Sequence, residues 1–181
     1  MEVGHDPKTG TVTMRQQVYI ERLLVRFGVD KCTPRKTPMV KKTFALLFPK
    51  SNEAHHGTHH LCEEDKAQYQ KLVGSFQWLS TMTRPDITFA TSLLARFVNS
   101  PTESHLQAAK YLLRYLRGTI TRGLYYSAQG DQGLQAFTDA AYADDLIDRK
   151  STSAYLFKLA GAPIAWKSQK QIILSGSTAD A

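Results

Sequence analysis

The stretch Phe137–Phe157, FTDAAYADDLIDRKSTSAYLF, decides the fold because it lies where the apolar pattern of the chain has changed from helical to alternating. Residues 134–138 and 152–158 overlap its two ends, and both alternate apolar and polar side chains as a half-buried strand does. Further strands are predicted at 123–127, 163–167 and 171–174, separated by Gly-rich or polar turns. The C-terminal part of the chain is therefore predicted to be β-rich.

Upstream of Gly118 the apolar residues recur at helical intervals instead. A short strand at 11–14 precedes helices at about 14–27 and 67–82 and a helix that begins at Pro85 and ends before Pro101. The best-specified helix is 101–117, with Ser100 as its cap, Pro101 at its first position and Gly118 at its exit. Helices followed by strands predict an α+β fold.

The charge of the chain is basic, with 23 Lys and Arg against 16 Asp and Glu, a net charge of +7. Residues 1–50 hold ten Lys or Arg and four Asp or Glu, so they alone contribute +6. A basic excess suggests a polyanionic partner such as nucleic acid. The candidate contacts are two basic stripes on predicted helices, for which an ordinary solvated face is the alternative: Arg15, Arg22 and Arg26, and Lys110, Arg114 and Arg117.

The cysteines and the N-terminus suggest an intracellular protein. Cys32 and Cys62 give no disulfide framework, and no apolar run approaches the roughly 20 residues that cross a bilayer. The N-terminal residues MEVGHDPKTG lack the apolar core of a signal peptide. A His-rich tract at 55–60 next to Cys62 offers zinc-ligand chemistry, but it lacks a second ligand segment and is better explained as a solvated tract in a linker.

An acidic cluster follows the strand at 134–138 and consists of Asp139, Asp144, Asp145 and Asp148. Tyr142–Asp145 reads Tyr-x-Asp-Asp, the form of a reverse transcriptase active site, in which adjacent carboxylates hold a divalent metal. A polymerase also requires a catalytic acid on a strand well upstream, and no strong strand pattern there carries one. A solvated acidic loop is the alternative explanation.

Taken together, several motifs resemble the Pol polyproteins of copia-type LTR retrotransposons. The blocks that carry the resemblance cover nearly the whole chain and occur in the order and spacing of that family. They are Tyr19–Leu24 with Arg26-Phe27-Gly28 and Thr37-Pro38-Met39, Tyr69–Ser75 with Thr83–Ile87, Pro101–His105 with Leu113–Thr119, and Asp148–Tyr155 with Trp166-Lys167-Ser168.

The resemblance implies a division into four parts. Residues 1–40 resemble the thumb-side end of the reverse transcriptase domain, and 41–66 a linker. Residues 67–128 resemble the helical connecting region, and 132–181 the opening antiparallel strands of an incomplete RNase H-like domain. In this frame the polymerase motif of the family lies upstream, so the Tyr-x-Asp-Asp tetrapeptide is accidental.

The resemblance also implies the site residues. Asp139 corresponds to the first catalytic, metal-holding aspartate of RNase H, and Asp180 to its second acid, one methylene shorter than the glutamate of the family. The intact family uses Mg²⁺, whereas the later acids are missing here, so we expect no functional cofactor in this chain. We therefore expect an inactive fragment of a copia-type polyprotein. The alternative is a non-catalytic module that binds an RNA·DNA hybrid or DNA, and a third hypothesis is an enzyme whose site another chain completes.

Overall fold

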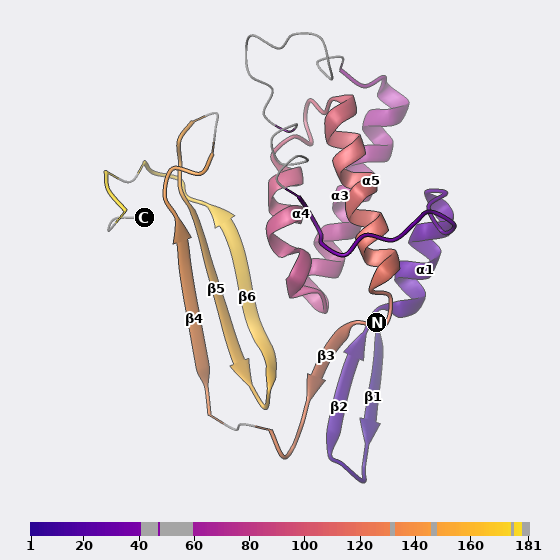
Figure 1. Ribbon diagram of the computed structural model, residues 1–181, viewed down its shortest axis with the longest axis vertical. Helices are drawn as coiled ribbons and strands as arrows, with labels where there is room; N and C mark the ends of the chain where they lie inside the picture. The colour runs from indigo at the N-terminus through magenta and orange to yellow at the C-terminus, as the bar shows by residue number, and fades with distance from the viewer. Residues whose placement is uncertain (41–46, 48–59, 131–132, 146–147, 175, 179–181) are drawn as a thin grey trace.

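The computed structural model describes residues 1–40, 47, 60–130, 133–145, 148–174 and 176–178 of the 181. It has an α+β architecture with a helical body and two three-stranded antiparallel sheets, one beside the helices and one below them in Figure 1. The α+β prediction is thus confirmed, while the RNase H-like identity of the second sheet stays a prediction. Most of the predicted linker, and most of the His-rich tract, lie outside the described residues.

The first sheet is formed by strands that precede and follow the helices in the chain. Strands β1 (Glu2–Asp6) and β2 (Thr11–Arg15) form a hairpin, and β3 (Gly123–Tyr126) pairs with β2 to give the order β1-β2-β3. Gly123 is required here because a Cβ atom would lie 2.3 Å from the Met14 carbonyl oxygen. The N-terminal hairpin is therefore tied to a strand more than a hundred residues later in the chain.

The helical body contains α1 (Gln17–Arg26), α3 (Glu63–Met82), the 3-10 turn η1 (Pro85–Ile87), α4 (Thr88–Ala95) and α5 (Glu103–Gly118). The apolar faces of these helices share one buried core, in which Ile20 and Leu24 of α1 join residues of α3, α4 and α5. Residues 17–26 and 63–118 consequently fold as one unit.

Two predicted helix starts are wrong, and both errors arise from side chains with other partners. The first helix begins at Gln17 instead of about 14, because Thr13 pairs within the sheet and the Gln16 side chain accepts a hydrogen bond from the Thr83 hydroxyl. Arg15 therefore lies at the end of β2, and no capping box forms there.

Helix α5 is capped by Thr102 instead of Ser100. Thr102 has an extended backbone, and its side chain and that of His105 form a reciprocal capping box. The His105 ring stacks on Phe97 at 4.0 Å between centroids. The sequence could not indicate this cap because His replaces the usual Glu or Gln at the third helical position.

The second sheet is formed by β4 (Gln135–Ala141), β5 (Thr152–Leu159) and β6 (Ala162–Lys170), in the order β4-β5-β6. The strand predicted at 171–174 is absent: the Gln171 backbone and side chain bind Ser151 and Ser153, and Ile172–Leu174 are exposed. β4 therefore lies at one edge of this sheet and β6 at the other.

The second sheet contacts the helical body through β6, which lies beside α4 (Figure 1). The Trp166 indole donates a 2.6 Å hydrogen bond to the Ser80 carbonyl of α3. The Tyr126 hydroxyl of β3 donates to the Pro163 carbonyl at 2.6 Å and so joins the two sheets. In the described ranges no helix combines the length and the apolar character that a bilayer crossing needs.

Candidate functional site

Asp139, the predicted metal ligand, lies on the edge strand β4 opposite Ala154 of β5. Its side chain is exposed, and one carboxylate oxygen accepts a 2.9 Å hydrogen bond from the Ala140 amide. In the described part of the chain it makes no ion pair within 4.0 Å. Asp139 is thus an accessible carboxylate.

The other acids of the cluster have different environments. Asp145 is only 1% exposed, and one of its oxygens lies 2.7 Å from both the Arg96 guanidinium and the Lys170 ammonium. Lys170 also pairs with Asp148 at 2.8 Å. These four residues, here named the Asp145 cluster, bring together the end of α4, the turn after β4 and the end of β6.

In the Asp145 cluster the opposite charges of Lys170 and the carboxylates stabilise the charged forms of these side chains. Burial by itself would lower the pKa of Lys170, but the carboxylates of Asp145 and Asp148 outweigh it, so the pKa of Lys170 is raised. The hydrogen bond from Lys170 lowers the pKa of Asp148. These carboxylates are therefore neutralised by side chains of the protein and serve to dock the sheet on the helices.

Asp144 belongs to the same contact between sheet and helix. It accepts a 2.9 Å hydrogen bond from the Thr152 hydroxyl, which in turn accepts one from Arg96 at 3.2 Å. The tetrapeptide Tyr142–Asp145 consequently has a structural role in this protein. The sequence gives no signal for it, because Arg96 precedes Asp145 by 49 residues.

The fit of Mg²⁺ to these residues is poor. No group of three or more His, Cys, Asp or Glu side chains within the described ranges is arranged to hold a metal ion. Asp180, the second predicted acid, lies outside the described residues. Two-metal hydrolysis needs several carboxylates from different elements, so Asp139 with its described neighbours does not form such a site.

Two residues of the Thr83–Ile87 motif, Arg84 and Asp86, belong to a second polar cluster. Arg84 is 1% exposed and binds Asp86 through two hydrogen bonds, of 2.9 and 2.8 Å, and the Thr119 hydroxyl at 2.6 Å. The Tyr115 hydroxyl donates to Asp86 at 2.7 Å. Burial favours a neutral Asp86, but Arg84 and Tyr115 outweigh that effect and lower its pKa. This motif therefore fixes η1 against α5.

The predicted basic residues fall into two groups. Arg22 and Arg26 are exposed on α1, whereas Lys110, Arg114 and Arg117 are half-buried on α5. Arg114 donates a 2.8 Å hydrogen bond to the Thr33 carbonyl, so its guanidinium is partly occupied in holding the segment after α1.

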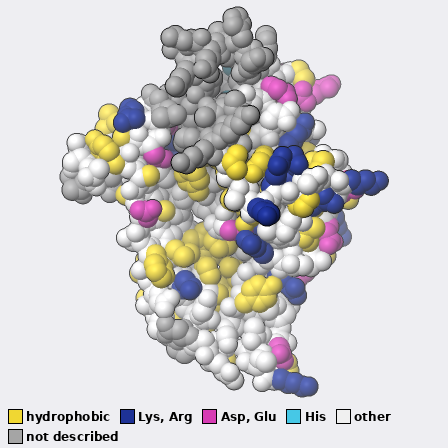
Figure 2. Space-filling model, in the orientation of Figure 1, with side chains coloured by type: hydrophobic (Ala, Val, Ile, Leu, Met, Phe, Trp, Pro, Cys, Tyr) yellow, Lys and Arg dark blue, Asp and Glu magenta, His cyan; other side chains and the backbone are white. Residues whose placement is uncertain are grey.

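Three further cations on this side of the molecule were not predicted. Lys31, Arg35 and Lys36 are exposed on the segment that follows α1 and crosses α5 (Figure 1). Arg35 lies over the Tyr111 ring at 5.3 Å from its centroid. Figure 2 shows Lys and Arg side chains gathered on this side of the helical body. We call Arg22, Arg26, Lys31, Arg35, Lys36, Lys110 and Arg114 the basic face. The basic residues in Lys31–Lys36 are visible in the sequence, but they lie outside the predicted helices and therefore outside the predicted basic stripes.

The comparisons with known proteins find relatives that include Pol polyproteins of plant transposons. A retrovirus-related Pol polyprotein from transposon TNT 1-94 of Nicotiana tabacum is 33% identical over 188 aligned residues, covering 100% of this chain and 13% of that protein. The Pol polyprotein from transposon RE1 of Arabidopsis thaliana is 38% identical over 158 residues, 87% of this chain and 10% of that protein. Secreted RxLR effector protein 161 of Plasmopara viticola is 43% identical over 103 residues, 57% of this chain and 72% of that protein.

No protein-family model and no solved structure matches the chain. The relatives first define a class, the retrovirus-related polyproteins of transposable elements. Within that class the chain belongs to the copia-type retrotransposon Pol polyproteins, as its motifs predicted. It spans about a tenth of the length of the polyproteins that it matches.

Proposed function

We propose that this chain is the part of a copia-type Pol polyprotein that links the polymerase to the RNase H, and that it binds an RNA·DNA hybrid without cutting it. In this proposal residues 1–40 form the end of the reverse transcriptase domain and residues 132–181 form the start of the RNase H-like domain. Residues 67–128 form the helical region that connects these two domains. The shared core of α1 with α3, α4 and α5 supports a rigid connection between the first two parts.

The observation that supports the absence of cleavage is the different environment of the two acids. Asp139 is accessible, whereas Asp145 is buried against Arg96 and Lys170. A carboxylate that neutralises two cations of the protein is a poor ligand for a further divalent cation. One free carboxylate holds Mg²⁺ weakly and cannot fix the spacing of two ions.

The observation that supports binding is the basic face. Its exposed cations come from α1 and the following segment, and half-buried cations of α5 extend it, so together they present positive charge over an extended surface. Lys and Arg contacts to phosphates supply most of the sequence-independent affinity for nucleic acids. Acids are sparse there, although Glu21 and Asp30 are exposed nearby.

Fluorescence anisotropy with a labelled RNA·DNA hybrid tests the binding. Lys36→Gln removes one exposed cation of the basic face and should weaken binding and lower the slope of log K against log salt by about 1. Lys8→Gln is the matched control, because Lys8 is equally exposed but lies at the tip of the β1–β2 hairpin. Equal effects of the two substitutions would argue against the basic face.

A second candidate function is favoured by the exposed position of Asp139 on an edge strand. Asp139 would then serve a site that another part of the polyprotein completes. In a polyprotein that cleaves hybrids, Asp139→Asn should abolish cleavage and leave the thermal stability unchanged. Full cleavage by the Asp139→Asn protein would exclude this role.

A further inference from the structure

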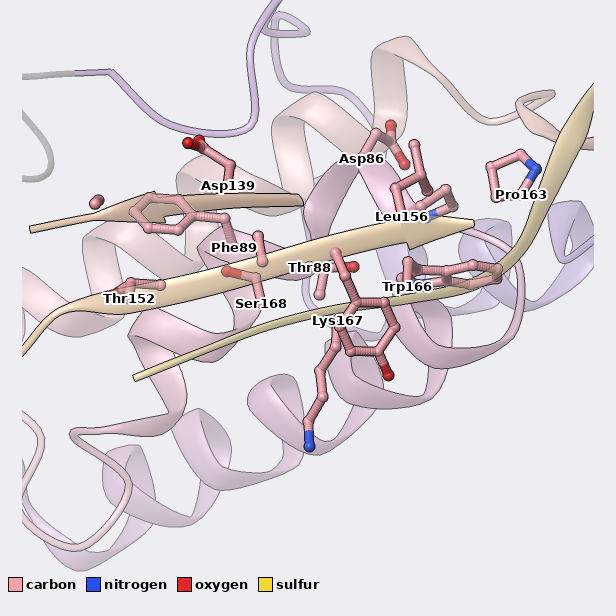
Figure 3. A pocket seen from close by; sticks show the side chains of 14 residues that line it. Asp86, Thr88, Phe89, Asp139, Thr152, Leu156, Pro163, Trp166, Lys167 and Ser168 are labelled. Atoms are coloured by element: carbon pink, nitrogen blue, oxygen red, sulfur yellow. The ribbon is translucent and has the colours of Figure 1, made fainter. Parts of the chain in front are cut away.

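A cavity of about 580 Å³ lies between the helical body and the inner face of the second sheet. Pro85, Thr88 and Phe89 line it from η1 and α4, and strands β4, β5 and β6 line it from the other side (Figure 3). Its walls are mainly apolar and include Leu156 and Trp166. This volume is within the range of small-molecule sites.

The charged residues around the cavity differ in whether they are paired. Asp139 and Asp86 are the acids that line it; Asp86 pairs with Arg84 at 2.8 Å, whereas Asp139 makes no ion pair with the described residues. Lys167 also borders the cavity, but it stands opposite Tyr155 on the other face of the sheet from Leu156 and Trp166. Figure 3 shows its side chain directed away from Asp139 and Asp86.

One polar group of the lining lacks a partner. The Thr88 hydroxyl is buried, and it makes no hydrogen bond to any described residue. A buried hydroxyl without a partner costs free energy, which a ligand with a suitable polar group would recover. The cavity thus offers aromatic walls, one unpaired hydroxyl and one free carboxylate.

We propose that this cavity binds a small planar aromatic cation. The Phe89 and Trp166 rings supply apolar and cation–π contacts to a flat cationic group, and the Asp139 carboxylate supplies the opposite charge at the rim. The Thr88 hydroxyl supplies a hydrogen bond to a polar substituent. An anionic ligand is disfavoured because the Asp139 carboxylate borders the space, whereas the charge of Asp86 is already paired with Arg84.

This site is independent of the nucleic-acid binding proposed above, since no residue of the basic face lines the cavity. Isothermal titration calorimetry with the purified chain, in the presence of EDTA and without nucleic acid, tests it directly. Three probes share one ring system and differ in charge: 2-naphthamidine, 2-naphthamide and 2-naphthoate. The cation is expected to bind about fivefold more tightly than the neutral amide, and the anion most weakly.

Two variants locate the binding. Asp139→Asn should reduce the affinity for 2-naphthamidine about fivefold and leave that for 2-naphthamide unchanged. Ala154→Phe, which places a ring in the cavity from β5, should abolish the binding of both. Asp30→Asn is the control for lost negative charge, because Asp30 is exposed and does not line the cavity.

Three results would overturn the proposal: no heat of binding with 2-naphthamidine, equal affinities for the three probes, or an affinity for 2-naphthamidine that Asp139→Asn leaves intact. The last result is decisive even if Ala154→Phe fails to fold, because Asp139 is exposed and its replacement by Asn is isosteric. A failure here leaves the hybrid-binding experiment unaffected, since the two assays share no ligand.

Discussion

At the scale of single residues, the acids Asp139 and Asp145 have opposite environments although six positions separate them. The alternating pattern at 134–138 and the family motif predicted a strand that ends at Asp139, and in the structure this strand, β4, extends to Ala141. The ion pairs of Asp145 do not follow from the sequence, because Arg96 and Lys170 come from other elements and periodicity carries no information about them.

Asp145→Asn is predicted to destabilise the protein more than any other change in the tetrapeptide. It leaves Arg96 without its buried counter-charge and Lys170 with Asp148 alone, which costs about 3 kcal/mol of the free energy of unfolding. Urea denaturation, monitored by circular dichroism, measures this change in the free energy of unfolding. Asp139→Asn, the control, should change that free energy by less than about 0.5 kcal/mol. Equal values for the two variants would contradict a structural role of Asp145.

The lowered pKa of Asp86 predicts how the stability of the protein depends on pH. Its pKa is lowered in the folded state, so its ion pair stabilises the protein above the unfolded pKa of about 3.9, and this contribution is lost as the pH falls through the folded pKa. Urea midpoints measured from pH 6 down to pH 3 should therefore decrease. In Asp86→Asn the decrease should be smaller, and a slope identical to that of the wild type would contradict this account.

At the scale of elements, the apolar periods located the helices and strands, but hydrogen bonds between distant residues set their ends. The Gln16–Thr83 bond spans 67 positions and helps to fix the start of α1. β1 was missed because its residues are mostly exposed and polar, so it lacks the alternation that identifies a half-buried strand.

The cap of α5 distinguishes the predicted helix start from the observed one. Thr102→Ala removes the observed capping oxygen and should cost about 1 kcal/mol of the free energy of unfolding. Ser100→Ala removes the cap that the sequence suggested and, with it, a 3.0 Å hydrogen bond to His60; it should cost less than about 0.5 kcal/mol. Thermal and urea unfolding of the two variants measure these losses in the free energy of unfolding. A larger loss for Ser100→Ala than for Thr102→Ala would place the cap at Ser100.

At the scale of the whole molecule, the family and the α+β order could be predicted, because the motifs extend along nearly the entire chain. The contacts between the parts could not. The pairing of β2 with β3, the shared core of α1 with α3 to α5, and the cavity behind β4 to β6 all arise from residues that are distant in sequence.

We propose that this chain binds an RNA·DNA hybrid and does not cut it. The most direct measurement is an anisotropy titration of a labelled hybrid at several salt concentrations in Mg²⁺, with the same samples examined on a denaturing gel. We expect an affinity that falls steeply with salt and an RNA strand that stays intact. Absence of binding at low salt, or an RNA strand that is cut by the wild type and spared by Asp139→Asn, would contradict it.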